Sequence, residues 1–147
     1  MADFVFNIAK GEVKNYCRLA ATNDALLYIL IESSGIETDA TLKDYDDVLA
    51  LLAGTSNEQT NQARKAVTAA TITVDDTIER VDSDIADQTY TALAGNAIGA
   101  IILAYDPDTT AGTDSTVIPL TKHDFTVTPD GTDVTAQIAA AGFYRAA

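Results

Sequence analysis

The sequence has few of the features that crosslink a chain or carry it through a membrane. Cys17 is the only cysteine among 147 residues, so an intrachain disulfide is excluded, which is consistent with a reducing compartment. No apolar run approaches the roughly 20 residues that a membrane-spanning helix needs. Met1 is not followed by a basic and then an apolar region, so we expect no signal peptide.

Basic residues are also scarce. Nine Lys and Arg stand against 22 Asp and Glu, which gives a formal net charge of −13 at pH 7. Nucleic acids and anionic membranes both require clustered positive charge, so we expect neither as a partner. The excess of carboxylates keeps a surface solvated and discourages random association. The functional alternative is attraction to a basic partner surface or to divalent cations.

No catalytic constellation is visible. His123 is the only histidine, and the spacing indicates neither the Cys or carboxylate partners of a metal site nor a nucleophile for a triad. Gly95 and Gly99 are too sparse for a phosphate-binding loop and lack the lysine that follows one. Cys17 lies on the apolar face of a predicted helix, as core cysteines do. We therefore predict no catalytic residue, no metal site and no cofactor, and expect that the chain is not an enzyme.

Two acidic regions deserve a structural interpretation. Residues 106–114 alternate oxygen-bearing side chains, but an EF-hand loop needs glycine at its sixth position and glutamate at its twelfth, where this chain has Ala111 and Val117. We expect a loop whose side chains cap their own backbone. A second group of carboxylates surrounds a predicted hairpin, and we expect these to be solvated: Asp75, Asp76, Asp82, Asp84 and Asp87.

The longest apolar runs predict the centre of a sheet. Residues 98–105 and 25–31 are short and almost continuously apolar, as strands covered on both faces are. Residues 117–120 and 124–128 follow as further strand segments. The stretch 97–131 is therefore the expected core of the fold.

Alternation, helical spacing and turn residues predict the remaining elements. We expect helices over 9–21 and 42–53, with Gly54 ending the second, and a polar loop over 55–62. Residues 63–66 suit either a helical turn or an entry into β structure. Expected strands cover residues 4–8, 71–74, 77–82 and 88–92, a return strand 132–135 after the Asp130-Gly131 turn, and a C-terminal segment 137–147 that closes a sheet or docks on a neighbour.

Helices gather in the first half of the chain and strands in the second. The sequence therefore predicts a single α+β domain over residues 1–147. Its N-terminal lobe, residues 1–66, would contain the helices, and its C-terminal lobe, residues 67–147, would be predominantly antiparallel β.

Several segments resemble a group of small phage virion-associated proteins, which are encoded near the major capsid protein of tailed phages and prophages. The resemblance spans nearly the whole chain and rests on ADFVFNIAKG (2–11), DATLKDYD (39–46), YDPDTT (105–110), IPLT (118–121) and GFYRA (142–146). It implies a virion structural role and transfers no functional residue.

The first hypothesis is a capsid decoration (cement) or minor capsid protein, made in the host cytoplasm and located on the capsid surface. Its partners would be the major capsid protein and further copies of itself. Alternatives are a tail or neck component and an exterior glycan-binding module that uses Tyr90, Tyr105 or the loop 106–114. The candidate interface residues, which also suit packing on their own sheet, are Phe4, Phe6, Phe143, Tyr144 and Arg145.

Overall fold

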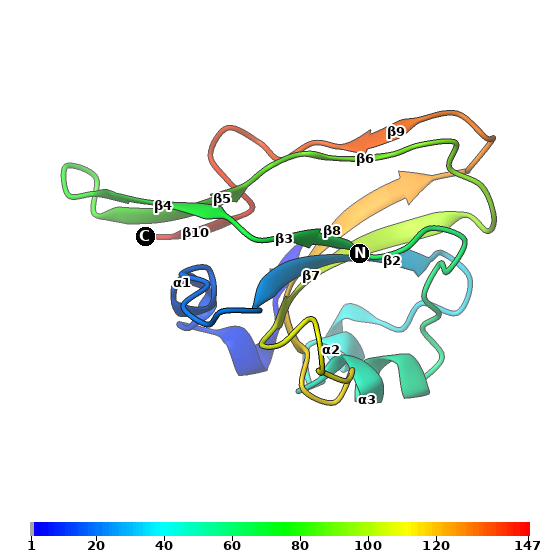
Figure 1. Ribbon diagram of the computed structural model, residues 1–147, viewed down its shortest axis with the longest axis horizontal. Coiled ribbons are helices and arrows are strands. Elements are labelled where there is room, and N and C mark those ends of the chain that lie inside the picture. Colours follow the sequence, from blue (N-terminus) through cyan, green and yellow to red (C-terminus); the bar gives the residue numbers. More distant parts are fainter. Residues whose placement is uncertain (1) are drawn as a thin grey trace.

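A five-stranded antiparallel sheet lies in the middle of the protein, with other layers on both of its faces (Figure 1). The computed structural model describes residues 2–147. The molecule is mostly antiparallel β structure with a few short helices, which confirms the α+β class. The strand order is β1-β8-β7-β2-β3, with bounds β1 Phe4–Val5, β2 Ala25–Glu32, β3 Lys65–Val67, β7 Ile98–Asp106 and β8 Ile118–Val127.

Strands β2 and β7 are covered on both faces, as their continuous apolar sequence predicted. All residues from Ala25 to Ile31 are buried. Because successive side chains point to opposite faces of a sheet, Tyr28 enters one core and Ile29 the other. Strand β8 runs as one element through both predicted segments, and Leu120 has no Cα partner where the pairing with β7 shifts between Leu103 and Ala104.

One face of the central sheet is covered by two smaller sheets. The expected hairpin over residues 71–82 is confirmed, although its second strand begins at Arg80 and continues to Ile85. The C-terminal segment closes this sheet by pairing with the hairpin. The elements are β4 Ala70–Asp75, β5 Arg80–Ile85 and β10 Tyr144–Ala146, in the order β10-β5-β4, and the pair β6 Gln88–Tyr90 with β9 Val134–Ala136.

The strand after the Asp130-Gly131 turn does not return along β8 as predicted. Strand β9 pairs with β6 instead. The connection is held by Leu93, whose N–H donates to the Thr132 carbonyl and whose carbonyl accepts from the Gly131 N–H, both at 2.9 Å. These bonds direct the chain away from β8. The turn residues therefore predicted a change of chain direction but not the strand with which β9 pairs.

The opposite face of the sheet is covered by α2 (Asp39–Leu42) and α3 (Val48–Ala53). The predicted single helix over 42–53 is wrong, because Asp47 is extended and its carboxylate accepts from the Ala50 N–H as a new N-cap. The Val48 N–H donates to the Val117 carbonyl instead of continuing the preceding helix. Val48 and Leu51 still face the core, whereas Leu49 is exposed, and Gly54 follows the last helical residue as expected.

The N-terminal elements are shorter than their patterns predicted. Strand β1 ends at Val5, because the Asn7 N–H donates to the Lys43 carbonyl and a 3₁₀ turn, η1 (Asn7–Ala9), follows. The predicted helix over 9–21 shrinks to α1 (Val13–Tyr16), between left-handed residues at Gly11 (φ 80°) and Leu19 (φ 45°).

The two sequence blocks share the central sheet, because β1 and β2 come from residues 1–66, β3 crosses residue 66, and β7 and β8 come from the later part. Residue 66 therefore does not divide the fold into two lobes in space. Of the two alternatives for residues 63–66, the entry into β structure holds, as β3 begins at Lys65. No helix within residues 2–147 is long and apolar enough to span a bilayer.

We expect truncation at the centre of the sheet to destabilise the fold strongly. Ile102 is 1% exposed, and Ile102→Ala leaves a cavity that should cost about 2–5 kcal/mol in free energy of unfolding. The matched control is Ile78→Ala at the hairpin tip, where the side chain is 52% exposed and the change should cost less than about 0.5 kcal/mol. Denaturant unfolding measures both, and equal losses would contradict the two-faced core.

Candidate functional site

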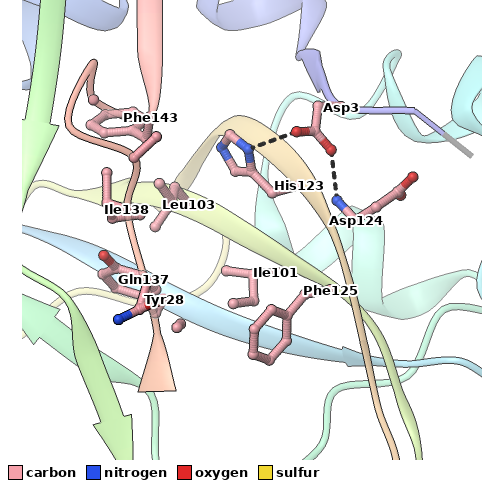
Figure 2. A pocket seen from close by; sticks show the side chains of 13 residues that line it. Asp3, Tyr28, Ile101, Leu103, His123, Asp124, Phe125, Gln137, Ile138 and Phe143 are labelled. Carbon is pink, nitrogen blue, oxygen red and sulfur yellow. Dashed lines mark hydrogen bonds and ion pairs between the residues drawn. The ribbon is translucent and has the colours of Figure 1, made fainter. Parts of the chain in front are cut away.

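A cavity of about 310 Å³ lies between the central sheet and the C-terminal segment that precedes β10. Figure 2 shows Leu103 of β7 beside Ile138, with Phe143 above them, and Ile101 of β7 beside Phe125. Most of the lining is apolar. The charged or titratable groups Asp3, His123 and Asp124 lie together, whereas Gln137 lies beside Tyr28. The remaining lining residues are Ala136, Ala139 and Gly142.

His123 and Asp3 form the polar end of this cavity. The imidazole Nδ1 lies 3.4 Å from one carboxylate oxygen of Asp3, and the other oxygen accepts from the Asp124 N–H at 2.7 Å. The imidazole Nε2 lies 2.9 Å from the Thr121 hydroxyl. A neutral ring that donates from Nδ1 to Asp3 and accepts at Nε2 satisfies both contacts. Burial lowers the pKa of His123, and the nearby Asp3 carboxylate opposes that shift.

The contacts Thr121–His123–Asp3 follow the order of a hydroxyl, imidazole and carboxylate triad. Thr121 is only 2% exposed and does not line the cavity, so its hydroxyl is not accessible to a molecule in the cavity. Sequence reasoning missed this arrangement. Alternation along β8 places Thr121 and His123 on one face, but Asp3 is 120 residues away and no local signal indicates it.

The loop 106–114 uses its carboxylates on its own backbone, as predicted. One Asp106 oxygen accepts from the Asp108 N–H at 3.0 Å. The Asp108 carboxylate accepts from the N–H and hydroxyl of Thr110, which holds its pKa below the usual range. Asp114 is turned toward the Arg64 guanidinium, which lowers its pKa as well. Within residues 2–147 no group of three or more His, Cys, Asp or Glu side chains is placed to hold a metal ion.

The carboxylates around the β4–β5 hairpin are more engaged than expected. Asp82 is paired with Arg80 and with Arg145 of β10, at 2.9 Å each. The others accept from backbone N–H groups, Asp75 from Thr77, Asp84 from Ile85 and Asp87 from Ile138, at 2.7–3.0 Å; Asp76 is exposed.

The aromatic interface candidates serve the interior of their own chain. Phe6 is fully buried and Phe143 is 8% exposed, so in this conformation neither offers a surface to a partner. Phe4 is half-buried, with the Lys43 and Lys122 ammonium groups 5.0 and 5.5 Å from its ring centroid. Tyr144 is half-buried, and Arg145 is exposed but paired with Asp82.

The tyrosines considered for glycan binding are also engaged. Tyr90 is fully buried in the core and has no exposed ring face for a sugar. The Tyr105 hydroxyl donates to the Asp24 carboxylate at 3.0 Å. Of the three glycan candidates, only the loop 106–114 remains largely at the surface.

Lys122 is a buried cation that the sequence did not reveal. Its side chain is fully buried, and its ammonium donates to the Ala2 carbonyl at 3.2 Å, lies 3.3 Å from Asp39 and pairs with Asp124. Asp39 also accepts from the Ala2 N–H at 2.8 Å, which is the main cause of its lowered pKa. These bonds fasten the N-terminal segment to β8 and α2. Because Lys122 falls between two predicted strand segments, the pattern placed it in a connection.

Comparison of the chain with family models, with curated proteins and with solved structures finds no match in any of the three.

The imidazole of His123 should titrate below its ordinary pKa of about 6.5. Because it is the only histidine, NMR titration of its ring protons reports it without assignment. Asp3→Asn should lower the midpoint further, since the Asp3 carboxylate favours the charged ring. Because the pKa of His123 is lower in the folded protein, the folded state binds fewer protons than the unfolded state as the pH falls below about 6.5. The free energy of unfolding therefore decreases as the pH falls through that value. A midpoint above 6.5 would contradict the dominance of burial.

Loss of the Lys122 ammonium should release the N-terminal segment. We expect Lys122→Met to lower the free energy of unfolding by about 1–3 kcal/mol. This loss is smaller than for a fully buried ion pair, because the carboxylates of Asp39 and Asp124 are partly exposed and can be rehydrated. Urea unfolding gives the free energy, and the NMR shifts of Phe4 report docking of the segment. The control Lys10→Met, at an exposed position, should change neither quantity, and an equal effect of both changes would refute this role.

Proposed function

We propose that the chain is a structural protein of a phage virion, a capsid decoration (cement) or minor capsid protein that stabilises the head by binding the major capsid protein. In this proposal it is made in the host cytoplasm, acts as a homo-oligomer on the capsid surface and catalyses no reaction. The resemblance of five segments spread from residue 2 to residue 146 supports the virion context.

The observation that carries the proposal is an acidic exterior on a sheet that is covered on both faces. Four of the nine basic side chains, Arg64, Arg80, Lys122 and Arg145, are held in ion pairs within the described residues, and the net charge is −13. A fixed surface of this charge complements a basic lattice and repels nucleic acid. Because a shell repeats its sites, contacts that are individually weak give strong stabilisation once several subunits are engaged.

The cavity does not favour an enzymatic alternative. Its only histidine has both ring nitrogens engaged, and the hydroxyl next to the ring is buried. A tail or neck component is the second structural candidate, and copy number separates it from the first. A glycan-binding module is less favoured because Tyr90 is in the core.

We expect purified shells that lack the chain to bind it when it is added back and to disassemble at a higher temperature afterwards. Binding should weaken as salt is raised from about 50 mM to about 500 mM, because an acidic surface that meets a basic lattice is screened by ions. Scanning calorimetry of the shells and electron microscopy of the particles measure stability and occupancy. A tail-like copy number, or shells whose stability does not change, would overturn the proposal.

A further inference from the structure

The outer edge of strand β4 is open. In the order β10-β5-β4 this strand pairs only with β5, and no backbone hydrogen bond to another element is found for residues 70–75. Proteins protect exposed edges with proline, lysine, bulges or very short strands, because an open edge is a template for pairing. Strand β4 reads ATITVD, has no proline or lysine, and pairs with β5 over six residues without a register shift.

The other edge strands of the described sheets are protected. Strand β1 has two residues, while β3 and β10 have three each. Strand β3 also begins with Lys65, which adds a positive charge beside its edge. Strands β6 and β9 also have three residues each, and β8 continues to Val127 beyond its pairing with β1 at Lys122. With six residues, β4 offers the longest open edge that a second extended chain can follow.

Apolar side chains are exposed beside this edge. The β4–β5 hairpin projects beyond the central sheet (Figure 1), and it carries Val74 at 55% and Ile78 at 52% exposure. Ala70, Ile72 and Val74 share one face of β4. The first two pack against the core, whereas Val74 lies further along the hairpin and stays uncovered. An added strand would place its own side chains beside Val74 on the same face of the sheet.

Charge selects the occupant. Between residues 75 and 87 the chain has six carboxylates and one basic residue, Arg80, so the formal charge of this stretch is 1 − 6 = −5. Arg80 is already paired with Asp82, as is Arg145 of the neighbouring strand β10. A second copy of the chain would bring the same negative charge to the same edge, whereas an extended segment with lysine or arginine would neutralise it.

We propose that the outer edge of β4 binds an extended, basic segment of a partner protein, which joins the three-stranded sheet as a fourth strand. Main-chain hydrogen bonds to β4 supply the affinity, while Val74 and the hairpin carboxylates select a segment that alternates apolar and basic side chains. This inference builds on the proposed function, which supplies the kind of partner, but its test uses a peptide and no particle.

The probe is a seven-residue peptide of alternating lysine and valine with blocked ends, and its control has glutamate in place of lysine. NMR shifts of the full chain should change along β4 and the hairpin tip with the lysine peptide only. Two further probes are N-methylated at alternate residues, one on each edge of the peptide. Because only one edge faces β4, one probe should bind about tenfold more weakly and the other within about twofold of the parent. Equal binding of both methylated probes would overturn strand addition.

A matched pair of variants tests the surface from the protein's side. Val74→Lys places a lysine on the edge, and Leu49→Lys makes the same change of charge on α3 at an equally exposed position, 55% in each case. Peptide binding should fall about tenfold for Val74→Lys and less than about twofold for Leu49→Lys. Equal losses would overturn the assignment of the edge.

Three further outcomes distinguish this inference from self-association and from the proposed function. If sedimentation shows that the chain forms an oligomer and that Val74→Lys dissociates it, the occupant of the edge is a second copy and the proposal of a basic partner is wrong. If shells bind the chain while the peptide does not, the virion role survives and this inference fails. If the peptide binds and shells do not, the edge is assigned correctly and the capsid role fails.

Discussion

The structure depends on the burial of two neighbouring strands, β2 and β7, on both of their faces. Their side chains are apolar at successive positions, so covering one face still leaves the other in contact with water. The fold meets this constraint with short helices on one side and two small sheets on the other (Figure 1). The short helices and the two small sheets therefore shield this pair of strands from water.

The same constraint explains where the polar groups are found. The charged residues of β8 lie where the N-terminal segment contacts this strand. Lys122 faces one side and is neutralised by Asp39 and Asp124, while His123 faces the other and meets Asp3 (Figure 2). Both groups bind the N-terminal segment to β8.

Sequence patterns predicted the parts of this fold that depend on nearby residues. Continuous apolar runs gave β2 and β7, alternation gave the β4–β5 hairpin, and Gly54 marked the end of α3. Patterns failed where a distant group competes with a local preference. Asp47 starts a new helix while the Val48 N–H bonds to Val117, and β9 pairs with β6 through bonds at Leu93. The contact between Asp3 and His123 was equally hidden, because it joins residues that no periodicity relates.

Strands β2 and β7, which are covered on both faces, form the most stable part of the protein. Strand β4, at the edge of the three-stranded sheet, has an outer side that is open. Native-state hydrogen exchange of the isolated chain tests this claim most directly. The account predicts that amides of β2 and β7 exchange only through global unfolding, while alternate amides of β4, those that face away from β5, exchange within the time of mixing. Protection along all of β4 as high as that in β7 would contradict it, because the edge would then already be covered.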